Sequence, residues 1–523
     1  MMSELLSLPD EVLKLVMHHV PIVERLTSCC LVNRRLHEAA VAATSELRLS
    51  FGSSDDSIPA EAQDCALKWL SHYGQHVTSL HMYGLDQVLV QPLPCPNLQK
   101  LHMFECSVQL GPGANGTAGM IHGCTKLTCL ELGSTRVDTR TPEGAVIASL
   151  SSLVHLQHLS VSPDYEVALL EGLSTAALPS LPQLTYLWVE NLSVENLLQL
   201  GGLTDLQELC LTVETDMPVS PTTCPGLVLP ASLTGLTLLL SVQGSILSLV
   251  PTGLQDLFME CDLQGPAEGP DSLLSCIARL QHLTQLKLNF VNPVVWPPAG
   301  PAYSALTASS RLARLVIHEA NFPAGVWQHV FPASHKLMHL TYLSSGWKFP
   351  ASLANLPSAW GAADLSSLVS CCPNLCAIVD ILFQHGPHVS ELHKLSALTH
   401  LELQFPASGV VSFMQSLSGV AAVTQLKALE LGLTQRGLPL ACFLPLTSLT
   451  ALTKLVMWEG RYHTSDHYQN LGTKVNFAQQ SVVGACSCDP SRHVSSFRSW
   501  HGHTGVMERF PSSSCTVTSQ CSA

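Results

Sequence analysis

Charge is scarce in this sequence, and its few basic residues form no run. Only 12% of the 523 residues are charged, whereas 46% are hydrophobic. The 39 acidic residues outnumber the 25 basic ones and give a net charge of −14. A chain without a lysine- and arginine-rich stripe lacks the surface that binds a nucleic-acid backbone, so we expect no nucleic-acid partner. The high apolar content excludes a disordered polar chain and indicates a long continuous core.

Signatures of nucleotide binding, catalysis and metal binding are also absent. The glycine-rich stretch at residues 111–116 lacks the Gly-Lys-Ser/Thr ending of a phosphate-binding loop, and no G-x-S-x-G or H-E-x-x-H motif occurs. Histidines and cysteines gather near the C-terminus without the paired C-x-x-C spacing of a zinc site. They are His463, His467, Cys486, Cys488, His493, His501 and His503. We interpret them as solvated side chains and expect no enzyme activity, no cofactor and no metal.

The first residues lack the basic start and the apolar run of a secretory signal. We therefore expect residence in the cytoplasm or nucleus, with the 19 cysteines reduced. One uncharged apolar segment, residues 231–250, is long enough for a membrane span, which is the alternative interpretation. Because it contains two glycines, ends at Pro251 and carries a copy of the repeat described next, we assign it to the repeats and expect no membrane partner.

What the sequence has in abundance is one leucine pattern, L-x-x-L-x-L, which returns mostly every 21 to 29 residues. The copies are Leu98–Met103, Leu127–Leu132, Leu156–Val161, Leu184–Val189, Leu206–Leu211, Leu233–Leu238, Leu254–Met259, Leu283–Leu288, Leu312–Ile317, Leu398–Leu403, Leu426–Leu431 and Leu452–Met457, with degenerate copies at Val77–Met82, Leu337–Tyr342 and Leu375–Asp380. The pattern and its period are those of a leucine-rich repeat. They predict an α/β solenoid, a horseshoe of about 15 irregular repeats with a parallel sheet on its concave side.

Further leucines three and six positions upstream of many hexads predict a helix or 3₁₀ turn on the convex side of each repeat, as in Leu200, Leu203 and Leu206. The asparagine or cysteine that usually follows the hexad is mostly missing, so we expect irregular curvature. Four prolines between residues 291 and 301 predict a loop. The 38 residues between Leu337 and Leu375 leave room for an excursion around Trp347 to Trp360.

Residues 5–45 do not follow the repeat, and their apolar spacing predicts three short helices. The stretch resembles the F-box in its L-P-x-E-V-L start at Leu8, its central Leu26 and its V-N-R-x-L end at Val32, where Leu36 replaces the usual tryptophan. The resemblance implies docking to a Skp-type adaptor, and through it to a cullin. The implied adaptor-binding residues are Leu8, Pro9, Val12, Leu13, Val16, Leu26, Val32 and Leu36. The alternative is a helical lid over the first repeat, since solenoids need a cap.

Alternate residues of each strand should point to the concave side, and several of these positions hold aromatic or acidic residues. We predict that they bind a protein substrate: His81, Tyr83, His102, Phe104, Tyr186, Trp188, Glu190, Phe258 and Glu260. The alternative is that helices or tail segments cover them as additional core.

The predicted organisation is a helical module (5–45), a linker (46–76), the repeats (77–458) and a low-order tail (459–523). The combination resembles F-box/leucine-rich-repeat proteins, which implies the non-catalytic substrate receptor of a Skp–cullin–F-box ubiquitin ligase. The sequence does not indicate which protein is the target. The alternative function is a scaffold that binds a cytoskeletal or ciliary (axonemal) protein, with the helical module acting only as a cap.

Overall fold

The structure is a computed structural model. It describes residues 8–20, 34–50, 60–85, 91–108, 119–137, 150, 152–162, 181–190, 200–212, 228–239, 249–261, 270–290, 296–318, 320, 322–346, 360–382, 387–405, 410–433, 440–459 and 474–475. The chain divides into two compact units, residues 1–477 and 478–523, and every described residue lies in the first.

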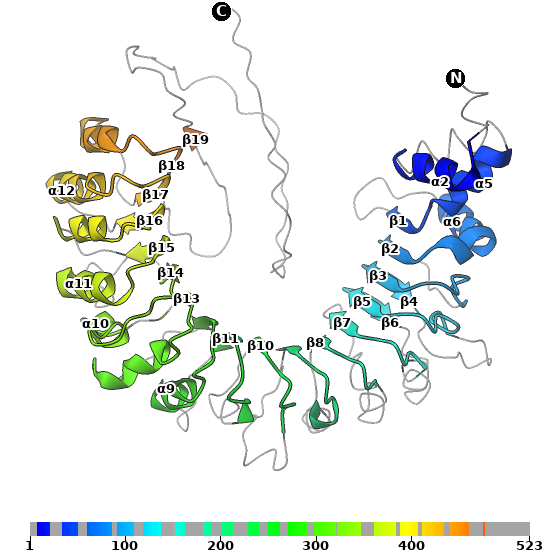
Figure 1. Ribbon diagram of the computed structural model, residues 1–523, viewed down its shortest axis with the longest axis horizontal. Coiled ribbons are helices and arrows are strands. Elements are labelled where there is room, and N and C mark those ends of the chain that lie inside the picture. Colours follow the sequence, from blue (N-terminus) through cyan, green and yellow to red (C-terminus); the bar gives the residue numbers. More distant parts are fainter. Residues whose placement is uncertain are drawn as a thin grey trace, which may run out of the picture. The chain divides into compact units, whose positions relative to one another are not determined.

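One long sheet forms the body of the first unit (Figure 1). Its strands pair in parallel with their neighbours in chain order, from β1 to β18. They are β1 (Glu46–Ser50), β2 (Ser79–Tyr83), β3 (Lys100–Phe104), β5 (Cys129–Gly133), β7 (His158–Ser162), β8 (Tyr186–Glu190), β9 (Glu208–Thr212), β10 (Gly235–Leu239), β11 (Asp256–Cys261), β12 (Gln285–Phe290), β13 (Arg314–His318), β14 (Tyr342–Ser344), β15 (Ala377–Leu382), β16 (His400–Phe405), β17 (Ala428–Leu433) and β18 (Lys454–Glu459). The short strands β4 (Ser107–Val108) and β6 (Arg136–Val137) pair separately, and β19 (Lys474–Val475) adds to β18 in the antiparallel sense.

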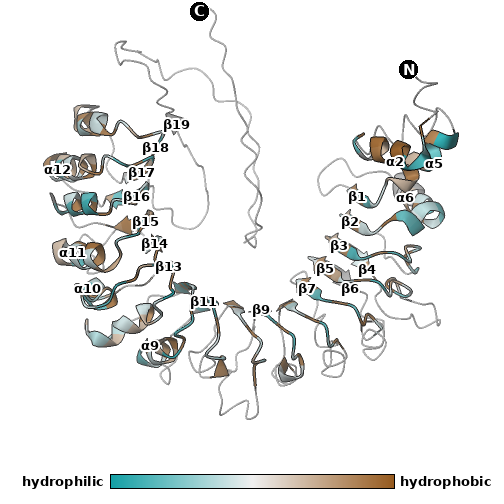
Figure 2. Cartoon of the chain, in the orientation of Figure 1, coloured by the Kyte–Doolittle hydropathy of each residue, from teal (hydrophilic) through white to brown (hydrophobic). Residues whose placement is uncertain are grey.

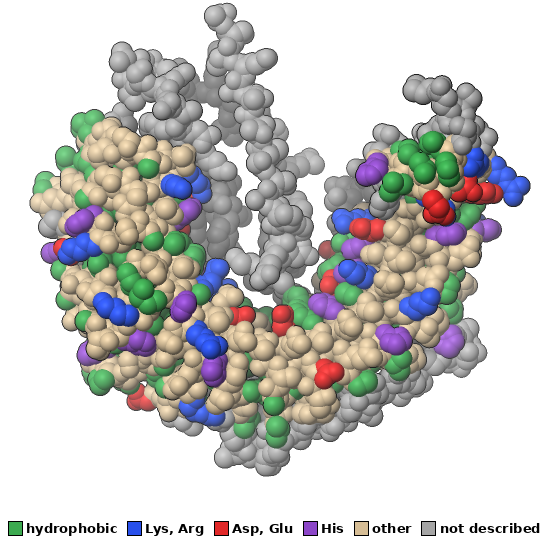
Figure 3. All heavy atoms as spheres, viewed as in Figure 1, with side chains coloured by type: hydrophobic (Ala, Val, Ile, Leu, Met, Phe, Trp, Pro, Cys, Tyr) green, Lys and Arg blue, Asp and Glu red, His purple; other side chains and the backbone are tan. Residues whose placement is uncertain are grey.

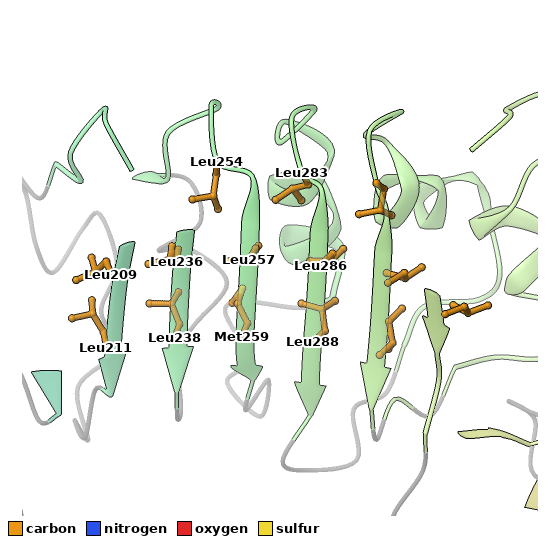
Figure 4. Packing of buried hydrophobic residues seen from close by; sticks show 14 of the residues in the cluster. Leu209, Leu211, Leu236, Leu238, Leu254, Leu257, Met259, Leu283, Leu286 and Leu288 are labelled. Carbon is orange, nitrogen blue, oxygen red and sulfur yellow. The ribbon is translucent and has the colours of Figure 1, made fainter. Parts of the chain in front are cut away.

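Each hexad builds its strand by alternation of buried and partly exposed side chains. In β10, for example, Leu236 and Leu238 are buried, whereas Gly235, Thr237 and Leu239 are partly exposed. Figure 4 shows the buried leucines of β9 to β12 stacked in rows from strand to strand. A single strand cannot bury these side chains alone, so each repeat depends on the next for its core.

The return segments contain helices and 3₁₀ turns, and α6 and α9 to α12 lie on the same face of the sheet (Figure 1). The α-helices are α2 (Asp10–His18), α5 (Arg34–Ala42), α6 (Ala60–Tyr73), α9 (Pro270–Ala278), α10 (Trp327–Val330), α11 (Ala362–Cys371) and α12 (Val410–Ala421). The 3₁₀ helices are η2 (Gly74–His76), η4 (Leu200–Gly202), η6 (Pro301–Thr307), η7 (Pro387–Lys394) and η8 (Leu440–Ser448). The upstream leucines close tight turns, as where the Leu203 amide donates to the Leu200 carbonyl, which agrees with the predicted 3₁₀ turns.

A row of threonines ties the entry of one strand to the entry of the strand before it. The hydroxyl of Thr234, in the second position of its hexad, donates to the carbonyl of Gln207 one repeat earlier, at 3.2 Å. The threonines in this row are Thr78, Thr128, Thr185, Thr234, Thr284, Thr341, Thr399 and Thr453. They occupy every second repeat. In the repeats between them, the same position holds a residue other than threonine, and the main-chain carbonyl of that residue accepts the bond. This threonine row was not predicted.

The predicted solenoid with a parallel sheet is confirmed, but three boundaries differ. The predicted linker contains β1, whose register with β2 places Leu47 opposite Leu80, so the sheet begins at Glu46. The copy predicted at Leu337–Tyr342 starts three residues later, because Leu340 and Leu343 are the buried residues that flank the start of β14. The short strand β19 lies wholly within the predicted tail.

The segment considered as a membrane span contains the strand β10 instead. Within the described ranges, the structure holds no helix that is long and apolar enough to cross a membrane. Of the predicted proline loop at residues 291–301, residues 291–295 lie outside the described residues, and residues 296–300 form no helix or strand. Most of the predicted excursion around Trp347 also lies outside the described residues.

Candidate functional site

The N-terminal helix α2 carries an exposed row of aliphatic side chains. Val12, Leu15 and Val16 lie at helical spacing on one side of the helix, with exposed fractions of 42%, 63% and 37%. Figure 2 shows hydrophobic residues on α2, and Figure 3 shows hydrophobic side chains at the surface of this end of the molecule. Adjacent exposed aliphatic side chains are costly in water, so this row is a candidate contact surface for another protein. We call these three residues the α2 stripe.

A different side of α2 holds the helical module together. Leu13 and Met17 are buried against Leu36 and Ala40 of α5, in a small core that is separate from the core of the repeats. The guanidinium of Arg35 donates to the carboxylate of Asp10, with 2.6 Å between Nη2 and Oδ1, which fixes the start of α2 against α5. The α2 stripe is therefore presented by a packed pair of helices.

The second candidate surface is the face of the sheet opposite α6 and α9 to α12, which we call the helix-free face because these described helices leave it uncovered. Alternate strand residues point to it, and the in-register ladder aligns them in rows across the strands. In one row, Tyr83 stacks on Phe104 with 5.3 Å between ring centroids. The next position in that row is Gly133, where an added Cβ would lie 2.3 Å from the Phe104 ring. A larger residue would displace the ring.

Five side chains on β2 to β8 form what we call the histidine–glutamate cluster: His81, His102, Glu131, His158 and Tyr186. Glu131 accepts hydrogen bonds from His102 Nδ1 at 2.5 Å and His158 Nε2 at 3.1 Å. The rings are held from the other side, because His81 stacks on His102 at 4.3 Å and Tyr186 on His158 at 4.0 Å. Burial alone would raise the pKa of Glu131, but the bonds from His102 and His158 outweigh it and lower the pKa to about 2. The Glu131 carboxylate is therefore ionised at neutral pH.

The middle of the helix-free face pairs cations with aromatic rings. Lys287 Nζ lies 4.1 Å from the centroid of the Phe258 ring, and the Arg314 guanidinium lies 4.2 Å from that of Tyr342. Each pair joins neighbouring strands and holds a charged group against an aromatic ring. This part of the face combines ring surface with positive charge.

Near the C-terminal end, four side chains form what we call the carboxylate cluster: Asp380, Glu402, Glu430 and Lys454. Asp380 sits at a register shift in β15 with a positive φ of 57°, and Gln404 donates to its carboxylate at 3.2 Å. Lys454 Nζ lies 2.5 Å from a Glu430 oxygen. Burial is the largest of the effects that raise the pKa of Glu402 to about 8. The charge of Asp380, a hydrogen bond with Asp380 and the charge of Glu430 act in the same direction. At neutral pH this glutamate holds a proton.

These surfaces offer ring stacking, charge and hydrogen bonds, which are the means of protein recognition. A family-level comparison matches residues 5–41 to the F-box domain. The chain carries an F-box domain ahead of a leucine-rich-repeat solenoid. F-box domains generally bind Skp-type adaptors.

Solved structures of similar fold include an internalin (inlF) from Listeria monocytogenes, with 16% identity over 76% of this chain and 93% of that one, at a TM-score of 0.39. The Toll–Spatzle complex of Drosophila matches with 14% identity over 73% of this chain and 50% of that one, at a TM-score of 0.42. The solenoid itself is established by the strand register and not by these similarities. No curated protein matches the chain.

The structure separates the predicted adaptor-binding residues into three groups. Pro9, Val12 and Val16 are exposed, and Leu8 is half-exposed at the start of the F-box. Leu13 and Leu36 are core residues of the F-box, with exposed fractions of 0% and 2%, so they cannot offer their side chains to a partner. Leu26 and Val32 lie outside the described residues. Leu15 was missed, although it lies three residues from Val12 on the same side of the helix.

Where their side chains are described, the predicted residues on the helix-free face are partly exposed or exposed: His81, Tyr83, His102, Phe104, Tyr186, Trp188, Phe258 and Glu260. The side chain of Glu190 is not among those described. The prediction missed the partners that connect these residues: Glu131, His158, Lys287, Arg314, Tyr342 and the carboxylate cluster. All of these except Asp380 occupy the alternate strand positions from which the predicted residues were chosen. Asp380 comes to the face only through the register shift in β15.

Replacing Glu402 by Gln is expected to stabilise the chain at pH 8 by about 1 kcal/mol, after allowance for solvent screening of a half-exposed group. Its pKa of about 8 lies above its ordinary value of 4.5, so the folded chain binds a proton in that interval that the unfolded chain releases. Stability should therefore fall as the pH rises from 4.5 to about 8. Thermal midpoints at pH 5 and pH 8 measure the effect.

The matched control is Glu208→Gln, which changes an exposed glutamate on the same face of β9. If Glu402→Gln and Glu208→Gln give the same midpoint shifts at both pH values, the carboxylate cluster does not hold the proton.

Proposed function

We propose that this chain is the substrate-recognition subunit of a Skp–cullin–F-box ubiquitin ligase. The F-box docks a Skp-type adaptor, and through it a cullin, while the helix-free face of the repeats holds a target protein for ubiquitination and degradation. The chain makes and breaks no bond. Its contribution is proximity, because a bound target lysine is held near the charged thioester on another subunit. The proposal places the chain in the cytoplasm or nucleus.

The observation that carries the proposal is the α2 stripe. A helical lid that only capped the repeats would turn a polar side to water, as terminal repeats of solenoids do. In this F-box, Val12, Leu15 and Val16 face outward, while Leu13 and Met17 already supply the internal core. Three outward aliphatic side chains are explained by a partner and not by the stability of the module itself.

The repeats supply the second half of the proposal. Their helix-free face presents rings and charges fixed in register by the sheet, from the histidine–glutamate cluster to the carboxylate cluster. A surface of this kind binds a protein through pre-positioned side chains, because little ordering is needed on contact. The mixed charge along the face favours a target with both basic and acidic groups over a nucleic acid.

The test is co-expression of the full chain with a Skp-type adaptor, followed by size-exclusion chromatography and addition of the cullin. We expect a stable complex with the adaptor that recruits the cullin. Proximity labelling in cells, with and without proteasome inhibition, should then reveal proteins whose labelling rises when degradation is blocked.

A chain that is folded by circular dichroism but does not bind the adaptor overturns the ligase proposal. In that case, labelled proteins that do not respond to proteasome inhibition favour the scaffold, with a cytoskeletal or ciliary protein on the repeats.

A further inference from the structure

Four potential metal ligands meet on three adjacent strands of the helix-free face. Cys129 and Glu131 lie two residues apart on β5 and therefore point to the same side. The register places His102 of β3 opposite Glu131, and His158 of β7 opposite Cys129. The ligand atoms of His102, Cys129 and Glu131 all lie within 4.8 Å of one another. Among the described residues, no other three histidine, cysteine, aspartate or glutamate side chains meet this closely.

The distances between these atoms bracket those of a tetrahedral site. Zinc bonds of about 2.0 to 2.3 Å place neighbouring ligand atoms roughly 3.3 to 3.7 Å apart. Here His102 Nδ1 lies 2.5 Å from Glu131 Oε2, and Cys129 Sγ lies 4.0 Å from Glu131 Oε1. Changes of less than about 1 Å in each distance would bring both into the zinc range. The parallel ladder thus supplies the scaffold that such a site needs.

The donor types and charges also fit one ion. Thiolate, imidazole and carboxylate together select zinc over the hard cations magnesium and calcium, which prefer oxygen alone. A thiolate and a carboxylate balance the charge of a divalent ion. The three side chains are partly exposed, with 15% of His102 and 27% of Glu131 accessible, so an ion can enter from the solvent.

The neighbours of the three ligands already hold them in place. His158 Nε2 donates to Glu131 Oε1 at 3.1 Å, and the ring of His81 stacks on that of His102. Hydrogen bonds of this kind orient ligands and typically change metal affinity 10- to 100-fold. His158 is in this respect a positioning residue.

We propose that His102, Cys129 and Glu131 bind a zinc ion on the helix-free face, with His158 orienting the carboxylate and a fourth position open to water. The site is independent of the ubiquitin-ligase proposal, since it requires no adaptor and lies on the repeats. It joins the side chains of β3 and β5 across the first repeats.

The experiment is a Co²⁺ titration of the purified, metal-free full chain, followed by displacement with Zn²⁺ and competition against a chromophoric chelator. The wild-type chain should give a thiolate-to-cobalt charge-transfer band, and Cys129→Ser should lose it. Zn²⁺ affinity should fall at least about 100-fold in Cys129→Ser and about 10-fold in His158→Gln, which keeps the band. His102→Gln should weaken binding as strongly as Cys129→Ser.

Cys210→Ser is the matched control, since Cys210 is a half-exposed cysteine on the same face of β9. Metal binding by cysteines and histidines elsewhere in the chain adds the same background signal in every variant. Identical cobalt spectra, stoichiometry and Zn²⁺ affinity for Cys129→Ser and Cys210→Ser overturn the proposal.

A second measurement avoids any variant that fails to fold. In the wild-type chain, Zn²⁺ should protect Cys129 from alkylation by iodoacetamide, as measured by mass spectrometry of its peptide, and should leave Cys210 unprotected. Alkylation of Cys129 at the same rate with and without Zn²⁺ contradicts the site. Complex formation with the adaptor should be unchanged in His102→Gln, so the two proposals fail separately.

Discussion

Replacing Leu15 by Asp is expected to weaken adaptor binding at least about 30-fold, which corresponds to about 2 kcal/mol. Leu15 is the most exposed member of the α2 stripe, with 63% of its surface accessible, so the change places a charge at the centre of the proposed contact without touching the core of the F-box. Affinity is measured by titration of the adaptor into the full chain, and the F-box should remain folded.

The matched control for Leu15→Asp is Val411→Asp. Val411 is an equally exposed aliphatic residue, with 69% accessible, on α12 of the repeats. Equal adaptor affinity in the two variants would remove the α2 stripe from the interface. Leu13→Asp is not informative, because Leu13 is fully buried and its replacement by a charge unfolds the module whatever its partner.

Replacing Leu286 by Ala is expected to lower the stability of the repeats by about 2 to 5 kcal/mol, the usual cost of a cavity at a buried leucine. Leu286 lies on β12 with no exposed surface, opposite Leu257 on one side and Leu315 on the other. Because each repeat contacts only its neighbours, the loss should appear mainly between β11 and β13. Thermal unfolding together with hydrogen exchange of these strands measures it.

The control for Leu286→Ala is Gln285→Ala, which changes the exposed residue just before it on the same strand. That variant should stay within about 0.5 kcal/mol of the wild type. Equal losses of protection in the two variants would mean that the leucine rows do not carry the stability of the sheet.

The repeats could be predicted because the hexad positions correspond one by one to buried strand positions. The first strand, β1, was missed because Thr44 occupies the place of the first leucine of its hexad. Thr44 is nevertheless fully buried, and its hydroxyl donates to the carbonyl of Ala40. A polar residue that satisfies its own hydrogen bond can replace leucine in the core, and a search for apolar residues does not find it.

The candidate surfaces could be predicted only in part, for a different reason. Strand alternation gives the direction of a side chain, which is why Tyr83 and Phe258 were placed on the correct face. The partners of a side chain depend on which strand positions lie opposite, as with His102 and Glu131, and this requires the register between repeats. On α2, the sequence pattern did not separate Leu13, which faces the core, from Leu15, which faces outward.

Because of the threonine row, repeats with and without a threonine at the strand entry alternate along the solenoid. A threonine such as Thr128 finds its acceptor, the Gln99 carbonyl, in a repeat that lacks threonine at that place. Every repeat offers a main-chain carbonyl as acceptor at this place, so only the hydroxyl donors alternate. Deleting one repeat would place two threonine-bearing or two threonine-free repeats side by side. Deleting a neighbouring pair would keep the alternation of hydroxyl donors along the sheet.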